Sequence, residues 1–209
     1  MQVIFNGIDI PFYEKYKDGC IIRENIGIPK DAFIIGMVGR LCEQKAPDIF
    51  IQMANKVKEQ ISNAYFIFVG DGELKNKIEQ YAKEHKLFDS IYITGWIDNP
   101  MSYIKLFDVA VLLSRWEGFG LVIPEYMIAR KPIVATAVDA IPNLITDSVN
   151  GLLISVDDPD AACNAVMELY SNLKLRNKLM MQAIKDVYEK YDIRRVVTEH
   201  EELFENLME

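Results

Sequence analysis

The chain has 209 residues, of which 50% are apolar and 26% charged, and its formal net charge is -8. This is the composition of a globular protein that can bury a sizeable core. The acidic balance excludes a general basic field for nucleic acid or anionic lipid. An anionic ligand would therefore have to be met by a few local cations.

Targeting and metal-binding signals are both absent from the sequence. Residues 1–9 contain neither a cationic region nor a long apolar run, so we expect no signal peptide, and no apolar run reaches the length of a membrane span. Cys20, Cys42 and Cys163 are scattered, and with only two histidines they form no zinc motif. We expect no metal site, and free thiols favour a cytoplasmic protein.

Short apolar runs alternate with helical patterns along the chain. Strands are predicted at residues 33–39, 64–69, 91–94, 108–113, 132–136 and 151–154. Helices are predicted at residues 46–60, 73–85, 101–106, 121–129, 158–171, 173–188 and 194–208. Apolar strands that alternate with helices indicate right-handed crossovers and a parallel sheet buried on both faces. We predict a single α/β domain with helices on both faces of the sheet and a helical C-terminal tail.

Ligands of such sheets bind outside the carboxyl ends of the strands, so the loop at residues 114–120 is a candidate site. Its two glycines allow a tight turn and a close approach of the backbone to a ligand. The next helix should begin near Leu121, because Pro124 fits a first turn, and it has no capping side chain. The amides of residues 119–122 are then available either to an anion, aided by the helix dipole, or to water.

Two carboxylates flank these amides. Glu117 lies in the loop and Glu125 about one turn into the helix, so both can face one crevice. Carboxylates are unsuited to bind phosphate but accept hydrogen bonds from sugar hydroxyls on either side of it. The alternative, that Glu125 is a solvated helix residue, is weakened because Leu121 and Ile128 on the same face are predicted to be buried.

Local cations follow the first strand. Arg40 and Lys45 lie in the loop at residues 39–45. A guanidinium, which can donate two parallel hydrogen bonds, together with a lysine ammonium is suited to bind a diphosphate. Alternatively, both are surface cations paired with Glu43 or Asp48.

The segment Gly-Asp-Gly-Glu at residues 70–73 is typical of a turn that leads into a helix. Asp71 is predicted to cap that helix.

Taken in order, these segments resemble the C-terminal half of the GT-B-fold retaining glycosyltransferases known as glycosyl transferases group 1. The specific element is the spacing of Glu117 and Glu125 around Gly-Phe-Gly. The similar stretches are residues 6–9, 39–41 with Lys45, 69–73, 95–96, 117–125, 132–136 and 150–153. The resemblance implies a Rossmann-like domain, one half of a GT-B fold, divided into an entry segment with a linker strand (1–30), an α/β core (31–156) and C-terminal helices (157–209).

The resemblance also assigns roles to residues. Arg40 and Lys45 would bind the donor diphosphate and stabilise it as it leaves, Glu117 would lie by the hydroxyls of the donor sugar, and these three would be the catalytic residues. Glu125 would hold the ribose hydroxyls. The implied donor-binding residues are Gly39, Arg40, Lys45, Gly118, Phe119, Gly120, Leu121 and Glu125.

The implied activity is metal-independent and retains configuration at the sugar. It transfers a hexose-type sugar from a nucleoside-diphosphate sugar, with UDP or GDP expected and no cofactor, to a glycan or lipid-linked acceptor, as in polysaccharide biosynthesis. An N-terminal acceptor-binding domain is expected to be missing, with the helix at residues 194–208 packing on it. The chain alone should then bind a nucleoside diphosphate weakly and transfer no sugar, and any membrane contact would come through the missing part.

The sequence departs from the family pattern at three places. Arg130 stands where glycine is usual, Tyr126 where alanine is usual, and Asp139 to Asn143 replace a Gly-Gly-x-Pro-Glu loop. Of these, Arg130, Asp139 and Asn143 support the first alternative, a non-catalytic binding or scaffold module. A sugar-nucleotide epimerase or a phosphorylase of the same architecture is the second. An NAD-dependent or flavodoxin-like enzyme is disfavoured, because no GxGxxG opens a helix after a strand.

Overall fold

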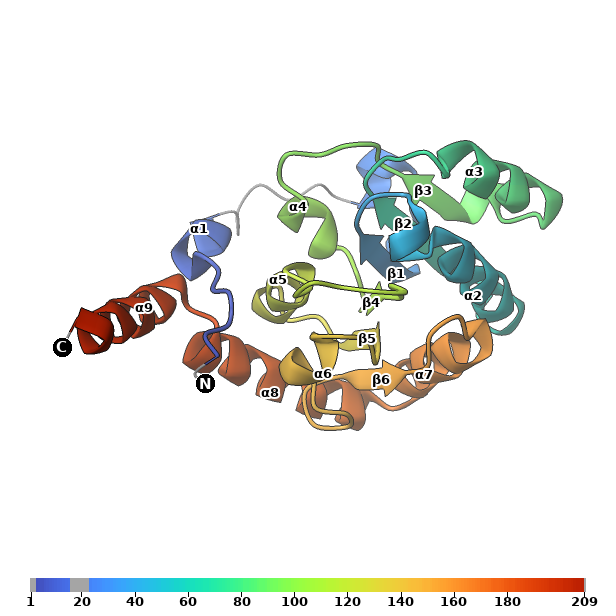
Figure 1. The fold of residues 1–209 in the computed structure, drawn as a ribbon. Helices are drawn as coiled ribbons and strands as arrows, with labels where there is room; N and C mark the ends of the chain where they lie inside the picture. The colour runs from blue at the N-terminus through green and yellow to red at the C-terminus, as the bar shows by residue number, and fades with distance from the viewer. Residues whose placement is uncertain (1–2, 16–22, 209) are drawn as a thin grey trace.

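A computed structural model describes residues 3–15 and 23–208, which form a layered α/β domain (Figure 1). All strand pairings in its six-stranded sheet are parallel, and the order is β3-β2-β1-β4-β5-β6. The strands are β1 (Phe33–Val38), β2 (Ala64–Val69), β3 (Ile91–Ile93), β4 (Val109–Leu112), β5 (Ile133–Thr136) and β6 (Leu152–Ile154). This order reverses between β1 and β4, as in doubly wound folds, and confirms the predicted fold class.

Helices cover both faces of the sheet, as predicted. Figure 1 shows α2 (Pro47–Gln60) and α7 (Pro159–Ser171) on one side and α4 (Met101–Ile104) and α5 (Val122–Ile128) on the other. The remaining helices are α1 (Ile10–Lys15), α3 (Lys75–Glu84), α6 (Ile141–Leu144), α8 (Leu173–Lys190) and α9 (Ile193–Met208), with short 3-10 turns η1 (Arg23–Ile26), η2 (Glu43–Lys45) and η3 (Phe88–Ser90).

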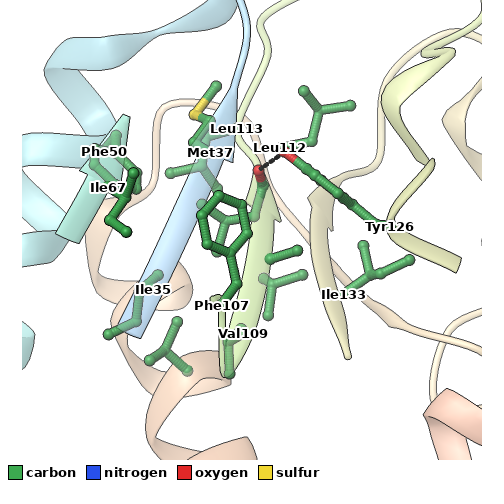
Figure 2. Packing of buried hydrophobic residues seen from close by; sticks show 14 of the residues in the cluster. Ile35, Met37, Phe50, Ile67, Phe107, Val109, Leu112, Leu113, Tyr126 and Ile133 are labelled. Carbon is green, nitrogen blue, oxygen red and sulfur yellow. Dashed lines mark hydrogen bonds between the residues drawn. The ribbon is translucent and has the colours of Figure 1, made fainter. Parts of the chain in front are cut away.

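The core lies along the two central strands. Ile35, Met37 and Val109 are fully buried, and Figure 2 shows Phe107 beside them. A Cβ at Gly36 would come within 2.1–2.3 Å of the Phe107 ring, so glycine allows this aromatic side chain to lie against β1. Burying such side chains contributes about 1.5–3 kcal/mol each, which explains why strands without polar alternation form the centre of the sheet.

Tyr126 of α5 occupies the point where β1 and β4 separate. Their ladder pairs only Ile35 with Val109 and Gly36 with Ala110. Past these two pairs, the buried Tyr126 hydroxyl accepts a hydrogen bond from the Val38 amide at 2.8 Å and donates one to the Val111 carbonyl at 3.3 Å. Figure 2 shows the Tyr126 ring reaching across to β4. The Tyr126 hydroxyl therefore bridges β1 and β4 in place of a direct backbone hydrogen bond between them, and the two strands separate toward their carboxyl ends.

Two predictions about local structure are wrong. Leu121, predicted to be buried on the same helix face as Glu125, is 50% exposed. Asp71 does not cap α3, because its Oδ1 accepts from Gly72 N at 2.8 Å and the helix begins only at Lys75. The Leu74 amide donates to the Leu41 carbonyl at 3.0 Å, which holds the preceding turn against the loop after β1 and delays the helix.

The described parts of the entry segment contain the helix α1 and the turn η1, and the linker strand within residues 1–30 stays a prediction. In the described parts of residues 1–30, the only strand-like pairing is the isolated bridge between Ile8 and Asp192, and α1 follows it directly. Asp9 explains the helix, because its side chain accepts from the Phe12 amide at 3.1 Å. Cys20, predicted to be a free thiol, lies outside the described residues; Cys42 and Cys163 are free.

The C-terminal helix α9 extends away from the sheet, beside α1 (Figure 1). Val196 is its one buried residue, while Val197, Phe204 and Leu207 are exposed. No helix in the described ranges combines the length and the apolarity that crossing a bilayer requires.

Candidate functional site

A cavity of about 580 Å³ lies where the loops after β1 and β4 meet, at the reversal point of the strand order. Both sides of the crevice contribute predicted site residues. Its lining contains Gly39, Lys45, Glu117, Gly118, Phe119, Gly120, Leu121 and Glu125, together with Asn6, Val38, Pro100 and Val122. The structure thus brings together every predicted site residue except Arg40.

Lys45 and Glu117 form the charged centre of this cavity. The Lys45 ammonium forms an ion pair with Glu117 Oε1, and the two side chains are only 18% and 5% exposed. Ser114 donates a second hydrogen bond to the same oxygen at 2.6 Å. A buried carboxylate needs such partners, because its desolvation costs several kcal/mol.

The loop that carries Glu117 is fixed from outside by Arg115. Its guanidinium bonds Asp48 Oδ2 of α2 at 2.7 Å, Asp157 Oδ1 at 2.7 Å and the Glu43 carbonyl at 2.9 Å. These bonds join the loop after β4 to the loop after β1 and to the start of α2. Arg115 thereby holds the loop that carries Glu117 beside the loop that carries Lys45, and it does not line the cavity.

Residues that follow Glu117 in the loop line the same cavity and, in the part of the chain that is described, have unpaired backbone amides. Within the described residues, no carbonyl or side chain accepts from the amides of residues 118–122, and α5 has no side-chain cap. Gly120 has φ +83, and an added Cβ would meet Ile141 at 2.6 Å, so only glycine fits this turn. The amides of residues 119–122 were predicted to be available either to an anion or to water, and the lack of a protein acceptor is compatible with both.

Asp139 binds the amide at the start of this loop. Its Oδ2 accepts from Glu117 N at 2.8 Å, and its backbone φ of +43 is left-handed. Arg130, the other non-glycine residue at a usual glycine position, has φ +57 just after α5. Both departures from the family pattern therefore fall where the backbone favours glycine.

Glu125 lines the same cavity as Lys45. Its Oε1 accepts a 2.7 Å hydrogen bond from the hydroxyl of Tyr13 on α1. Burial raises the pKa of the Glu125 carboxyl above its ordinary value, and the Tyr13 hydrogen bond opposes that rise. The pKa of Tyr13 is raised too, by burial and then by the nearby Glu125 charge, so Tyr13 is the donor at neutral pH.

Arg40 lies in a neighbouring cavity of about 530 Å³, which shares Val38, Gly39 and Pro100 with the first. Its side chain is 72% exposed and bonds Glu73 at 3.2 Å. Neither Arg40 nor Lys45 pairs with Glu43 or Asp48, which had been the alternative. The second cavity is mainly apolar, and its other lining residues are Val69, Gly70, Asp71, Gly72, Trp96 and Ile97.

The sequence did not predict the contacts of four side chains with the site. These are Tyr13, Ser114, Arg115 and Asp139, the last of which accepts a hydrogen bond from the Glu117 amide. Ser114 could have been found, since it precedes Glu117 by three residues at a strand end. Tyr13 carried no signal, because it is 112 residues from Glu125. In the described ranges, no cluster of three or more His, Cys, Asp or Glu side chains could hold a metal ion.

A doubly wound sheet with a cation, two carboxylates and open amides at its reversal point defines a ligand-binding α/β domain. Residues 20–186 match the family described as glycosyl transferases group 1. The chain belongs to this family, as the sequence motifs predicted. It spans about half the length of the curated relatives that it matches.

Similar proteins include a UDP-Gal:alpha-D-GlcNAc-diphosphoundecaprenol alpha-1,3-galactosyltransferase of Escherichia coli, 30% identical over 90% of this chain and 54% of that protein. The crystal structure of Anabaena Alr3699/HepE in complex with UDP and glucose has a TM-score of 0.89 at 22% identity, over 98% of this chain and 57% of that one. The crystallised C-terminal domain of LpcC, a glycosyl transferase group 1 family protein from Francisella tularensis, has a TM-score of 0.74 at 26% identity, over 92% of this chain and 97% of that one.

Proposed function

We propose that this chain is the donor-binding domain of a retaining glycosyltransferase and that it holds a nucleoside-diphosphate sugar between β1 and β4. The observation that carries the proposal is the shared cavity, in which Lys45, the open amides of residues 118–122, Glu117 and Glu125 face one another. It offers positive charge and donors at its centre and carboxylates on both flanks, which suits a diphosphate between two polyhydroxyl groups.

The diphosphate lies against Lys45 and the open amides in this proposal. Gly39 lets the nucleotide approach β1 closely, since it has no side chain. Arg40 reaches the same phosphates by exchanging its exposed partner Glu73 for them, which costs little because an exposed pair contributes only about 0–1 kcal/mol. Lys45 likewise moves part of its charge from Glu117 to the incoming anion.

The flanking carboxylates bind hydroxyl groups. Glu125 accepts from the ribose, which places the base in the adjoining apolar cavity beside Trp96. Glu117 and the amides of residues 118–121 contact the hexose-type sugar on the opposite side. UDP and GDP are the proposed nucleotides, and UDP is supported by the Anabaena structure, whose crystals contain UDP and glucose.

The reaction transfers the sugar from the diphosphate to an acceptor hydroxyl. The acceptor oxygen bonds the anomeric carbon while the bond to the β-phosphate oxygen breaks, and the acceptor proton passes to the departing diphosphate. Negative charge develops on that diphosphate, beside Lys45 and the loop amides that line the cavity and within reach of Arg40 once it leaves Glu73. We propose that these groups serve without a metal ion or a cofactor, and that attack from the leaving-group side retains configuration.

The acceptor, a glycan or a lipid-linked saccharide, is proposed to bind a second domain of the complete enzyme. The exposed apolar residues Val197, Phe204 and Leu207 of α9 offer a surface on which such a domain can pack. The length of the curated relatives, about twice that of this chain, supports this arrangement. By itself the chain then binds donor weakly and transfers nothing. The free thiols support a cytoplasmic location.

Isothermal calorimetry with UDP, GDP and ADP tests the proposal. At least one should bind, and Lys45→Met should weaken it at least tenfold, since a charge-assisted hydrogen bond contributes about 1.5–3 kcal/mol. Lys56→Met is the matched control, because Lys56 pairs with the exposed Asp160 on α7. No heat with any of the three nucleotides, or equal losses in the two variants, would refute it.

A non-catalytic binding module is the second candidate, favoured by one observation. Asp139 places a carboxylate on the Glu117 amide at the start of the loop, where it adds negative charge beside the proposed sugar position. A sugar-transfer assay of the complete enzyme separates the two candidates: turnover establishes the transferase, and tight donor binding without turnover establishes the module.

A further inference from the structure

The hydroxyl of Tyr13 makes one hydrogen bond in the described structure, to Glu125 Oε1 at 2.7 Å. Tyr13 does not line the cavity and reaches the carboxylate from α1, behind it. Every buried side-chain nitrogen or oxygen of the described residues has a hydrogen-bond partner. Among the residues that the structure describes, Glu125 Oε2 has no such partner, so this oxygen is accessible, and Glu125 lines the cavity.

Helix α1 is itself held in place at its start. Ile8 N donates to the Tyr191 carbonyl at 2.8 Å, and Ile193 N donates to the Ile8 carbonyl at 3.0 Å. Ile10, the first residue of α1, is buried. A segment far from α5 in the sequence is thus attached between α8 and α9 and presents a rigid phenol to a carboxylate of the site.

We propose that Tyr13 is a positioning residue that fixes the Glu125 carboxylate through Oε1 and so aims Oε2 at the two ribose hydroxyls of a bound nucleotide. The inference rests on the proposed function, because it names what orients one of its binding groups. A carboxylate held by one strong bond loses less rotamer freedom when a ligand arrives, so the ligand binds more tightly. The same bond favours the ionised carboxylate, which accepts from both hydroxyls.

The test is a thermodynamic cycle between Tyr13→Phe and the ribose hydroxyls. Binding is measured by calorimetry for UDP and for 2′,3′-dideoxy-UDP, or for the corresponding GDP or ADP pair if that nucleotide binds more tightly. Tyr13→Phe should weaken the ribonucleotide about 5–10-fold, the value of one hydrogen bond, and the dideoxy form less than about 2-fold. A purely structural role would weaken both nucleotides equally, because it does not distinguish the sugar.

The chain offers a matched control in Tyr188, whose hydroxyl donates to Glu14 on the same helix α1 at 2.6 Å. Tyr188→Phe removes the same group next to the same helix but away from Glu125, and it should leave both affinities unchanged. Equal losses for the two nucleotides in Tyr13→Phe, with wild-type binding intact, overturn this inference alone. If the wild-type chain binds no nucleoside diphosphate, the proposed function fails first.

Discussion

The pair of Lys45 and Glu117 makes a prediction about stability that is independent of any ligand. Lys45→Met removes the cation and keeps most of the side-chain volume. It leaves the Glu117 carboxylate, which is 5% exposed, with only the Ser114 hydroxyl at 2.6 Å and the solvent of the cavity.

The size of the effect follows from these contacts. Removing one partner of a buried ion pair costs about 3–5 kcal/mol, and the remaining hydroxyl bond and the open cavity reduce this to about 2–3 kcal/mol. For a chain of this size that corresponds to a fall in Tm of about 4–12 °C. Adding Glu117→Gln to Lys45→Met removes the uncompensated charge, so the double variant should recover about 2 kcal/mol relative to the sum of the single variants.

Urea denaturation of the four proteins at pH 7, followed by circular dichroism, measures this coupling. The exposed pair of Arg40 and Glu73 provides a second cycle as a control, with an expected coupling below about 0.5 kcal/mol. Single-variant effects for Lys45 and Glu117 that add to within about 0.5 kcal/mol would show that the pair is not the buried cluster described.

Three further predictions concern single residues. Because burial raises the pKa of Glu125, its contribution to stability is fully present below the unfolded pKa and is lost as pH rises through the folded pKa. Glu125→Gln should therefore raise Tm at pH 7.5 but not at pH 4, while weakening nucleotide binding; a lower Tm at pH 7.5 contradicts this. Arg130→Gly relieves a left-handed φ of +57 and should stabilise the chain by about 0.5–1 kcal/mol in urea, whereas a loss would refute the backbone argument. Tyr126→Phe leaves the Val38 amide without its partner and should cost about 1–3 kcal/mol, and unchanged stability would exclude the hydroxyl bridge.

The sheet was predictable because its information is local. Each strand is a run of apolar residues, and the alternation with helices determines parallel pairing and a ligand edge at the carboxyl ends. The loop of Glu117 and its neighbours could be predicted for the same reason, because glycines and an uncapped helix start within a few residues of one another specify it.

The contacts between distant segments were not predictable. Lys45 and Glu117 are 72 residues apart, and Tyr13 and Glu125 are 112 apart, so neither pairing leaves a pattern in the sequence. Helix α1 has six residues, too few for an apolar period to be recognised. The prediction that Asp71 caps α3 was wrong for the opposite reason. The local sequence is typical of a helix start, but the hydrogen bond from the Leu74 amide to the Leu41 carbonyl delays the helix.

The most direct test of the proposed site is a crystal structure of this chain with UDP bound. The proposed function predicts that the diphosphate lies within hydrogen-bond distance of the Lys45 ammonium and of the amides of residues 118–121, with the ribose hydroxyls on Glu125. A diphosphate bound outside this crevice, or a ribose that makes no contact with Glu125, would contradict it.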